Sequence, residues 1–181
     1  VLIYCEHSNG KMKKGSLELL SNAAAWGVET HALLLGTPGS LESLAAEINH
    51  FAPHTLHLAE SSALSSYSSD GYAKVVADVA KSIGPDALFT SVSAQSKDFF
   101  PRVAVKLDAG MASDCTELKV EGGTLEAKRP MYAGKLFGTV DFKNAKLKIA
   151  SIRPNALGMK PEKPGNATIN KVSADPGAIR A

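Results

Sequence analysis

Short apolar runs punctuate the first half of the chain. Each run holds four or five residues, is dominated by aliphatic or aromatic side chains, and ends in a polar or glycine-containing stretch. Uninterrupted runs of this length are typical of strands that are buried on both faces of a parallel sheet. The four predicted strands are Val1–Cys5, His31–Leu35, Thr55–Ala59 and Ala87–Thr90.

A segment with helical spacing of apolar residues follows each predicted strand. Apolar positions recur at intervals of three and four residues, which places them on one face of a helix. The four stripes are Leu17, Leu20 and Ala24; Leu41, Leu44, Ala45 and Ile48; Tyr72, Val75, Val76, Val79 and Ile83; and Phe99, Phe100, Val103, Ala104 and Leu107. Pro101 is expected in the first turn of the last helix. Alternating strands and helices predict a three-layer, Rossmann-like α/β fold with a parallel sheet.

The rhythm changes after Asp108, where successive strands replace the strand–helix alternation. The expected strands are Cys115–Val120, Thr124–Lys128, Leu136–Phe142 and Leu147–Ile152, with EGG and FKNAK as hairpin-type turns. This pattern predicts an antiparallel β-extension that completes a domain over residues 1–154. Residues 155–181 are rich in proline and read as an extended arm or linker, with one possible strand at Ala167–Val172.

Composition excludes several classes of protein. The net charge is +2 and only 6% of the residues are aromatic, so neither a basic stripe nor a base-stacking platform for nucleic acid is present. No apolar run is long enough for membrane insertion. Cys5 and Cys115 match no zinc spacing and no disulfide framework, and Cys5 is expected to be a buried thiol.

The best ligand candidate is the loop Ser91–Asp98, at the carboxyl end of the fourth strand, where α/β sheets bind ligands. Its candidate contacts are Ser93, Gln95 and Lys97, because small polar residues at a helix start can hold an anion. An ordinary helix cap explains the same residues equally simply. The chain contains neither a GxGxxG motif nor a P-loop.

No catalytic constellation or metal site is predicted. No serine lies in a nucleophile-elbow motif. His54 and His57 form an HxxH, but on a strand they point to opposite faces and lack a third ligand. Glu6 follows the first strand and is expected to anchor a neighbouring loop.

The stretch KRPMYAGK, residues 128–135, combines basic residues, a proline, an aromatic and a glycine. A P-loop would require a glycine at Arg129 and a serine or threonine at Leu136, so a phosphate grip is excluded. Pro130 cannot donate to a strand ladder, and Gly134 permits a tight turn. The stretch therefore predicts a shaped break between strands, either as an internal turn or as an interface formed by Arg129, Tyr132 and Gly134.

Four blocks, in this order, resemble electron transfer flavoprotein α subunits. They are VLIYCEHSNGKMKKGSLELLSNAA at the start, SAQSKDFFPRVAVKLDAGMASDCTELKV in the middle, KRPMYAGK and IASIRP. The likeness is collinear over about residues 1–154. It implies an adenine-nucleotide-hydrolase-like fold and the N-terminal domain of such a subunit, without the FAD-binding domain that follows it in the family.

The resemblance also implies a function. The full heterodimer of α and β subunits would hold FAD and carry electrons from flavin dehydrogenases to a quinone reductase or another acceptor, and the redox chemistry would belong to the flavin. This domain would be a scaffold that contacts the β subunit, with no catalytic residue and no cofactor of its own. The compartment would be the cytoplasm in a bacterium or the mitochondrial matrix in a eukaryote. The alternative is a stand-alone domain that binds or senses an adenine nucleotide.

Overall fold

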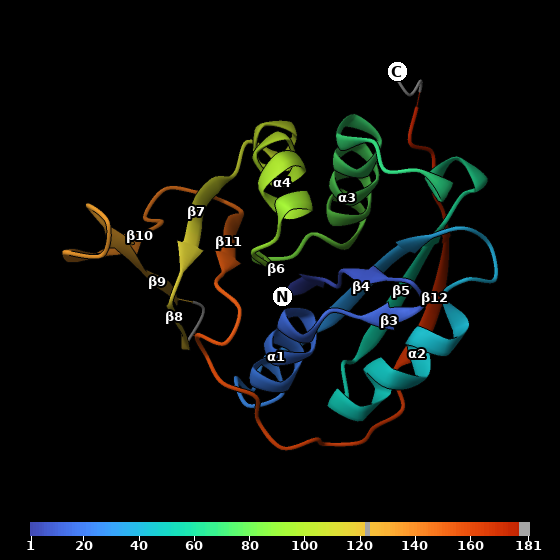
Figure 1. Ribbon diagram of the computed structural model, residues 1–181, viewed down its shortest axis with the longest axis horizontal. Coiled ribbons are helices and arrows are strands. Elements are labelled where there is room, and N and C mark those ends of the chain that lie inside the picture. The colour runs from blue at the N-terminus through green and yellow to red at the C-terminus, as the bar shows by residue number, and fades with distance from the viewer. Residues whose placement is uncertain (122–123, 178–181) are drawn as a thin grey trace.

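The computed structural model describes residues 1–121 and 124–177, and its centre is a seven-stranded parallel sheet (Figure 1). The strand order is β12-β5-β4-β1-β6-β11-β7, and every neighbouring pair is parallel. The four predicted strands are confirmed as β1 Leu2–Tyr4, β4 His31–Gly36, β5 Thr55–Glu60 and β6 Ala87–Ser91. The predicted three-layer α/β class is therefore confirmed.

Two helices cover each face of the sheet (Figure 1). One face carries α1 Lys14–Ala23 and α2 Glu42–Ile48, and the other carries α3 Ser69–Ile83 and α4 Ala94–Leu107. Short 3-10 helices follow α2 at Asn49–Phe51 and β5 at Ser62–Ser65. Along β1, Leu2 and Tyr4 pack under α3 and α4, whereas Ile3 packs under α1 and α2. Because β1 and β4 are buried on both faces, their sequences show no regular alternation of polar and apolar residues.

The helix α4 begins earlier than its apolar stripe predicts. Its cap is Ser93, which places Pro101 well inside the helix rather than in the first turn, so that expectation is wrong. Pro101 has no amide hydrogen to donate to the Lys97 carbonyl, and the helix continues through it to Leu107. No helix in the described part of the chain has the length and apolarity needed to span a bilayer.

The β-extension is smaller than the sequence predicts. The antiparallel sheet consists of β8 Glu117–Glu121, β9 Thr124–Met131 and β10 Leu136–Asp141. The predicted fourth strand is β11 Lys148–Ile152, which instead lies parallel to β6 and β7 in the main sheet. FKNAK therefore crosses between two sheets and closes no hairpin, while Gly122 and Gly123 of EGG lie outside the described residues. Strand periodicity alone does not say which sheet a strand joins.

Two further strand assignments differ from expectation. The run predicted as one strand from Cys115 is divided between β7 Gly110–Cys115 in the main sheet and β8 in the small sheet. Strands β2 His7–Ser8 and β3 Lys11–Met12 form a small hairpin in the loop after β1. The division at Thr116 lets the chain leave the main sheet, so that the small sheet packs at its edge (Figure 1).

The arm that begins at residue 155 follows the surface of the molecule and returns to the main sheet (Figure 1). The predicted strand in this arm is β12 Thr168–Ser173, which pairs in parallel with β5 over its whole length. Upstream, the buried Glu18 carboxylate accepts hydrogen bonds from the amides of Asn155, Leu157 and Gly158 at 2.7–2.8 Å. The arm therefore supplies the edge strand of the sheet, and residues 178–181 lie outside the described part.

Candidate functional site

The carboxyl ends of β1 and β6 meet where the chain direction across the sheet reverses. The loop after β1 leads to α1 on one face, and the loop after β6 leads to α4 on the other. Such a switch point is where open α/β sheets bind ligands. The predicted loop Ser91–Asp98 lies at this point, so the structure places it where a ligand loop would be.

The polar groups of this loop bind one another. Ser93 and Ser96 form a reciprocal capping box, in which each hydroxyl accepts the other residue's amide at 2.8–2.9 Å. The Gln95 side chain accepts a hydrogen bond from the buried Tyr4 hydroxyl at 3.4 Å. Lys97 is exposed in the first part of α4. The structure therefore shows the cap, and of the three predicted contacts only Lys97 projects freely into solvent.

The start of α1 closes the crevice between β1 and β6. A Cβ atom on Gly15 would lie 2.0 Å from the Ser91 hydroxyl oxygen, so only glycine allows this approach. Next to it, the Glu6 amide donates to the Ser16 hydroxyl at 2.9 Å, which ties the loop after β1 to α1. Backbone and small side chains thus pack closely together at the switch point.

The stretch KRPMYAGK forms the end of β9 and the turn that leads into β10. Tyr132, Ala133 and Gly134 all have positive φ angles, of 49°, 56° and 85°, and Lys135 completes the turn. Tyr132 is 72% exposed, and the hairpin projects away from the body of the molecule (Figure 1). The predicted shaped break between strands is therefore a hairpin turn, and Pro130 lies within β9 opposite Phe137.

Arg129 lies at the base of this hairpin. Its side chain is half-buried, and its Nε atom is buried with no hydrogen-bond partner in the described part of the chain. An unmade hydrogen bond of a buried polar group costs on the order of 1–3 kcal/mol. Arg129 and Tyr132 are brought onto the same hairpin, as predicted, but their side chains differ sharply in exposure.

An ion pair that no sequence motif indicates lies at the carboxyl ends of β7 and β11. Arg153 binds Asp114 in bidentate fashion, with Nε to Oδ1 at 3.0 Å and a terminal nitrogen to Oδ2 at 2.7 Å. These hydrogen bonds lower the pKa of the Asp114 carboxyl. Both residues stand in the blocks SDC and IRP at predicted strand ends, but their pairing depends on the strand order, which the sequence does not reveal.

The histidines are structural in the described chain. His54 accepts a hydrogen bond from the Thr30 amide at 3.0 Å, while His57 contacts His31 through ring nitrogens 2.9 Å apart. Burial, and secondarily His31, lower the pKa of His57. The described residues contain no group of three or more side chains that could hold a metal ion. His54 and His57 thus have separate partners, Thr30 and His31.

Both cysteines are free, buried thiols. Burial raises the pKa of Cys5 to about 12 and that of Cys115 to about 11. A thiol that keeps its proton at neutral pH is a poor nucleophile. Cys5 is therefore the core thiol that its position in an apolar run predicts.

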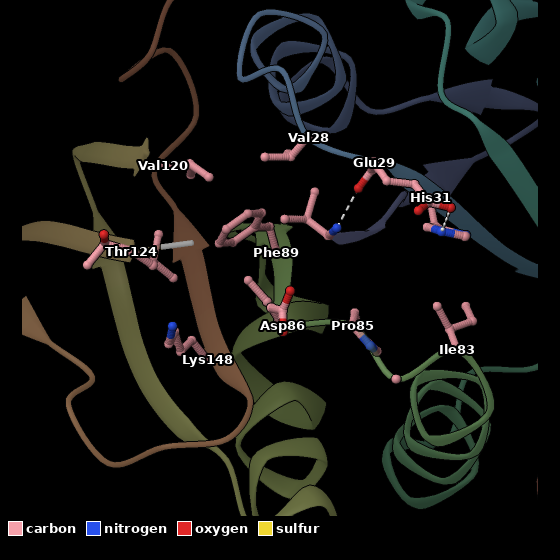
Figure 2. A pocket seen from close by; sticks show the side chains of 14 residues that line it. Val28, Glu29, His31, Ile83, Pro85, Asp86, Phe89, Val120, Thr124 and Lys148 are labelled. Atoms are coloured by element: carbon pink, nitrogen blue, oxygen red, sulfur yellow. Dashed lines mark hydrogen bonds and ion pairs between the residues drawn. The ribbon is translucent and has the colours of Figure 1, made fainter. Parts of the chain in front are cut away.

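A cavity of about 380 Å³ opens at the other end of the strands, their amino ends (Figure 2). Its polar lining consists of Glu29, His31, Asp86, Thr124 and Lys148, and Phe89 forms an apolar wall. Figure 2 shows Glu29 and His31 on one side of the cavity and Val120 and Thr124 on the other. The cavity therefore lies at the opposite end of the strands from the loop Ser91–Asp98. None of the predicted site residues lines it.

Comparison with known proteins identifies the family. The model of the electron transfer flavoprotein domain matches residues 1–176. The chain belongs to the electron transfer flavoprotein family. The match includes the arm and β12, in agreement with the pairing of β12 in the main sheet.

The curated relatives of this electron transfer flavoprotein domain include α subunits. The electron transfer flavoprotein subunit alpha of Clostridium acetobutylicum is 32% identical over 178 residues, which cover 95% of this chain and 52% of the relative. Protein FixB of Clostridium saccharobutylicum is 33% identical with the same coverage. A probable mitochondrial α subunit of Cryptococcus neoformans is 29% identical over 94% of this chain and 49% of its own length. The chain spans about half the length of these relatives.

Proposed function

We propose that this chain is the N-terminal scaffold and subunit-interface domain of an electron transfer flavoprotein α subunit. The family match over residues 1–176 and the α subunits among the relatives support this assignment. The described residues contain no nucleophile–base pair at the switch point, where hydroxyls cap a helix. The domain would therefore act as part of an electron carrier, whose redox chemistry belongs to FAD in the complete α/β heterodimer.

The observation that carries the interface proposal is the exposed apolar hairpin. Met131, Tyr132, Leu136 and Phe137 are 45–72% exposed and lie within one turn and its flanking strand ends. Neighbouring exposed apolar side chains mark protein–protein contacts, and Tyr and Arg are enriched there. We therefore propose that the hairpin, with Arg129 at its base and Gly134 in its turn, docks on the β subunit.

The wider activity follows from this assignment as a proposal. The heterodimer would accept electrons from flavin dehydrogenases and pass them to a quinone reductase or another acceptor. It would work in the cytoplasm of a bacterium or in the mitochondrial matrix of a eukaryote. The 181-residue chain itself should purify without flavin. Stoichiometric flavin absorbance on this chain would contradict the scaffold assignment.

The interface is tested by substitution at the base of the hairpin. Arg129→Ala in the complete α subunit should weaken binding to the β subunit by about tenfold or more, as for other interface arginines. Its melting temperature should change little, because the Nε atom has no hydrogen bond to lose. Calorimetric titration with the β subunit and thermal unfolding give the two values. A large fall in melting temperature with unchanged binding would show that the stretch is only an internal turn.

The alternative of a stand-alone nucleotide-binding domain is tested separately. Micromolar binding of AMP or ATP to this chain, lost in Ser93→Ala or Lys97→Ala, would favour the alternative. The capping box engages the Ser93 hydroxyl, and Gly15 packs on Ser91. We therefore expect no heat of binding in a calorimetric titration with either nucleotide.

A further inference from the structure

Cationic side chains gather around Asp114 at the carboxyl edge of the sheet. Arg153 binds the carboxylate directly, and the charges of Lys97 and Arg129 also lower the pKa of Asp114. Lys97 comes from α4, Arg129 from β9 and Arg153 from the end of β11. Three cations thus act on the one carboxylate of Asp114.

Backbone hydrogen bonds join the four segments that carry these residues. The Val92 amide donates to the Ile152 carbonyl, the Arg153 amide to Cys115, and the Thr116 amide to Lys128, each at 2.8 Å. The N-terminus of α4 starts directly after Val92, and its helix dipole adds positive potential at the same corner. Lys97, Arg129 and Arg153 are thus held on a rigid framework.

Lys97, Arg129 and Arg153 form a cationic corner, and exposed apolar side chains of the hairpin lie beside it. Residues two apart on a strand share a face, so Arg129 and Met131 point to the same side of β9. Leu136 on β10 is paired with Met131 and shares that side. Met131 is 45% exposed and Leu136 is 59% exposed. The surface therefore places exposed apolar area beside positive charge.

Arg129 keeps part of its side chain at the surface of this corner. The Nε atom is buried without an acceptor, while the residue as a whole is only half-buried, so part of the side chain reaches the surface. A guanidinium group matches a carboxylate in planar, bidentate geometry. A free phosphate would satisfy the charge but would leave Met131 and Leu136 uncovered.

We propose that Lys97, Arg129 and Arg153 receive carboxylate side chains of the β subunit, while Met131 and Leu136 pack against apolar side chains beside them. This inference rests on the proposed function and extends the interface from the hairpin to α4. It gives Lys97 a role in steering the partner, because charges at the rim of an interface act mainly on the rate of association.

The test reverses one charge in the complete α subunit. Lys97→Glu is matched by Lys106→Glu, which makes the same change at the other end of α4. Glutamate near a helix N-terminus is favourable, so Lys97→Glu should fold. At low salt, stopped-flow mixing with the β subunit should show association slowed about tenfold by Lys97→Glu and by less than about twofold by Lys106→Glu. High salt should remove most of the difference, because it screens exposed charges.

The outcomes separate this inference from the proposed function. Equal association rates for the two variants at low salt would overturn the cationic contact, even if the hairpin substitution Arg129→Ala still weakens binding. Saturable binding of inorganic phosphate that Lys97→Glu abolishes, with association unchanged, would also overturn it and would show a small-oxyanion site. A wild-type α subunit that does not bind the β subunit would refute the proposed function itself.

Discussion

Glu18 shows how a single buried charge fixes a distant segment. Its side chain is 5% exposed in α1, and its two carboxylate oxygens accept three backbone amides from the arm. Asn22, one helical turn after Glu18 in α1, donates to the Gly158 carbonyl at 2.8 Å. Both the amide and the carbonyl of Gly158 are therefore hydrogen-bonded to α1. A buried carboxylate is tolerated when hydrogen bonds replace its water. The arm is therefore held on α1 by hydrogen bonds to a buried side chain, in addition to the packing of Ala156 and Leu157 against the core.

Neutralising Glu18 should loosen the arm. In Glu18→Gln one oxygen becomes an amide group that cannot accept, so at least one buried amide loses its partner. We expect a loss of about 1–3 kcal/mol in unfolding free energy, measured in urea, together with faster amide exchange at residues 155–158. The control is Glu126→Gln on the exposed side of β9. Equal stability of the two variants would show that Glu18 does not anchor the arm.

For single residues, the sequence predicts an interaction when the two partners are close together in the chain. Ser93 caps α4 through Ser96, three residues away, and polar residues at a helix start indicate this directly. Glu18 has no such signal, because Asn155 lies 137 residues away. Arg153 and Asp114 are missed for the same reason, since they meet only through the neighbouring positions of β7 and β11.

The β9–β10 hairpin, which is a candidate for a functional contact, has a strained backbone in its turn. Tyr132 and Ala133 both have left-handed φ angles, which cost about 1–2 kcal/mol for a residue with a Cβ atom. Gly134 takes the third such position without this cost. An exposed tyrosine at a strained position fits a contact role better than an internal turn.

Relief of this strain should stabilise the chain. Ala133→Gly removes the Cβ atom at a φ of 56°, and the gain is partly offset by the greater freedom of glycine in the unfolded chain. We expect an increase of about 0.5–1 kcal/mol in unfolding free energy by thermal or urea denaturation. Gly134→Ala, at a φ of 85°, should lower it instead. A fall in stability with Ala133→Gly would contradict the strain argument.

Elements are predicted well where their own sequence defines them. The four helices and the strands β1, β4, β5 and β6 occur where the apolar pattern places them. The sheet membership of β11 is predicted wrongly, because a strand of five residues carries no mark of its neighbours. Its IASI core is buried on both faces, which is the one signal that favours the parallel sheet.

At the scale of the whole molecule, β12 completes the sheet. It covers β5 with six paired residues, and the Asn170 amide donates to the ring of the buried His57 at 3.1 Å. Without β12, the β5 edge would present unpaired backbone groups, and open edges of this kind pair with other chains. The arm is therefore part of the fold.

Removal of β12 should make the chain self-associate. A chain ending at Asn166 should elute as oligomers or aggregates in size-exclusion chromatography with light scattering. It should also lose about 1–3 kcal/mol in unfolding free energy, because the buried ring of His57 loses Asn170, one of its two hydrogen-bond partners. A chain ending at Ala174 retains β12 and is the matched control. Monomeric behaviour and unchanged stability of the shorter chain would contradict a closing role for β12.

The sequence by itself determined the α/β class, the positions of the first four strands and of the helices, the buried thiol of Cys5 and the family likeness. These features depend on local periodicity and on short blocks, which a linear chain displays directly. Only the tertiary structure decided that β11 and β12 join the parallel sheet, that Glu18 holds the arm, and that Lys97 and Arg129 share one corner with Arg153. Those facts depend on which strands become neighbours, and that choice is made by packing across the whole molecule.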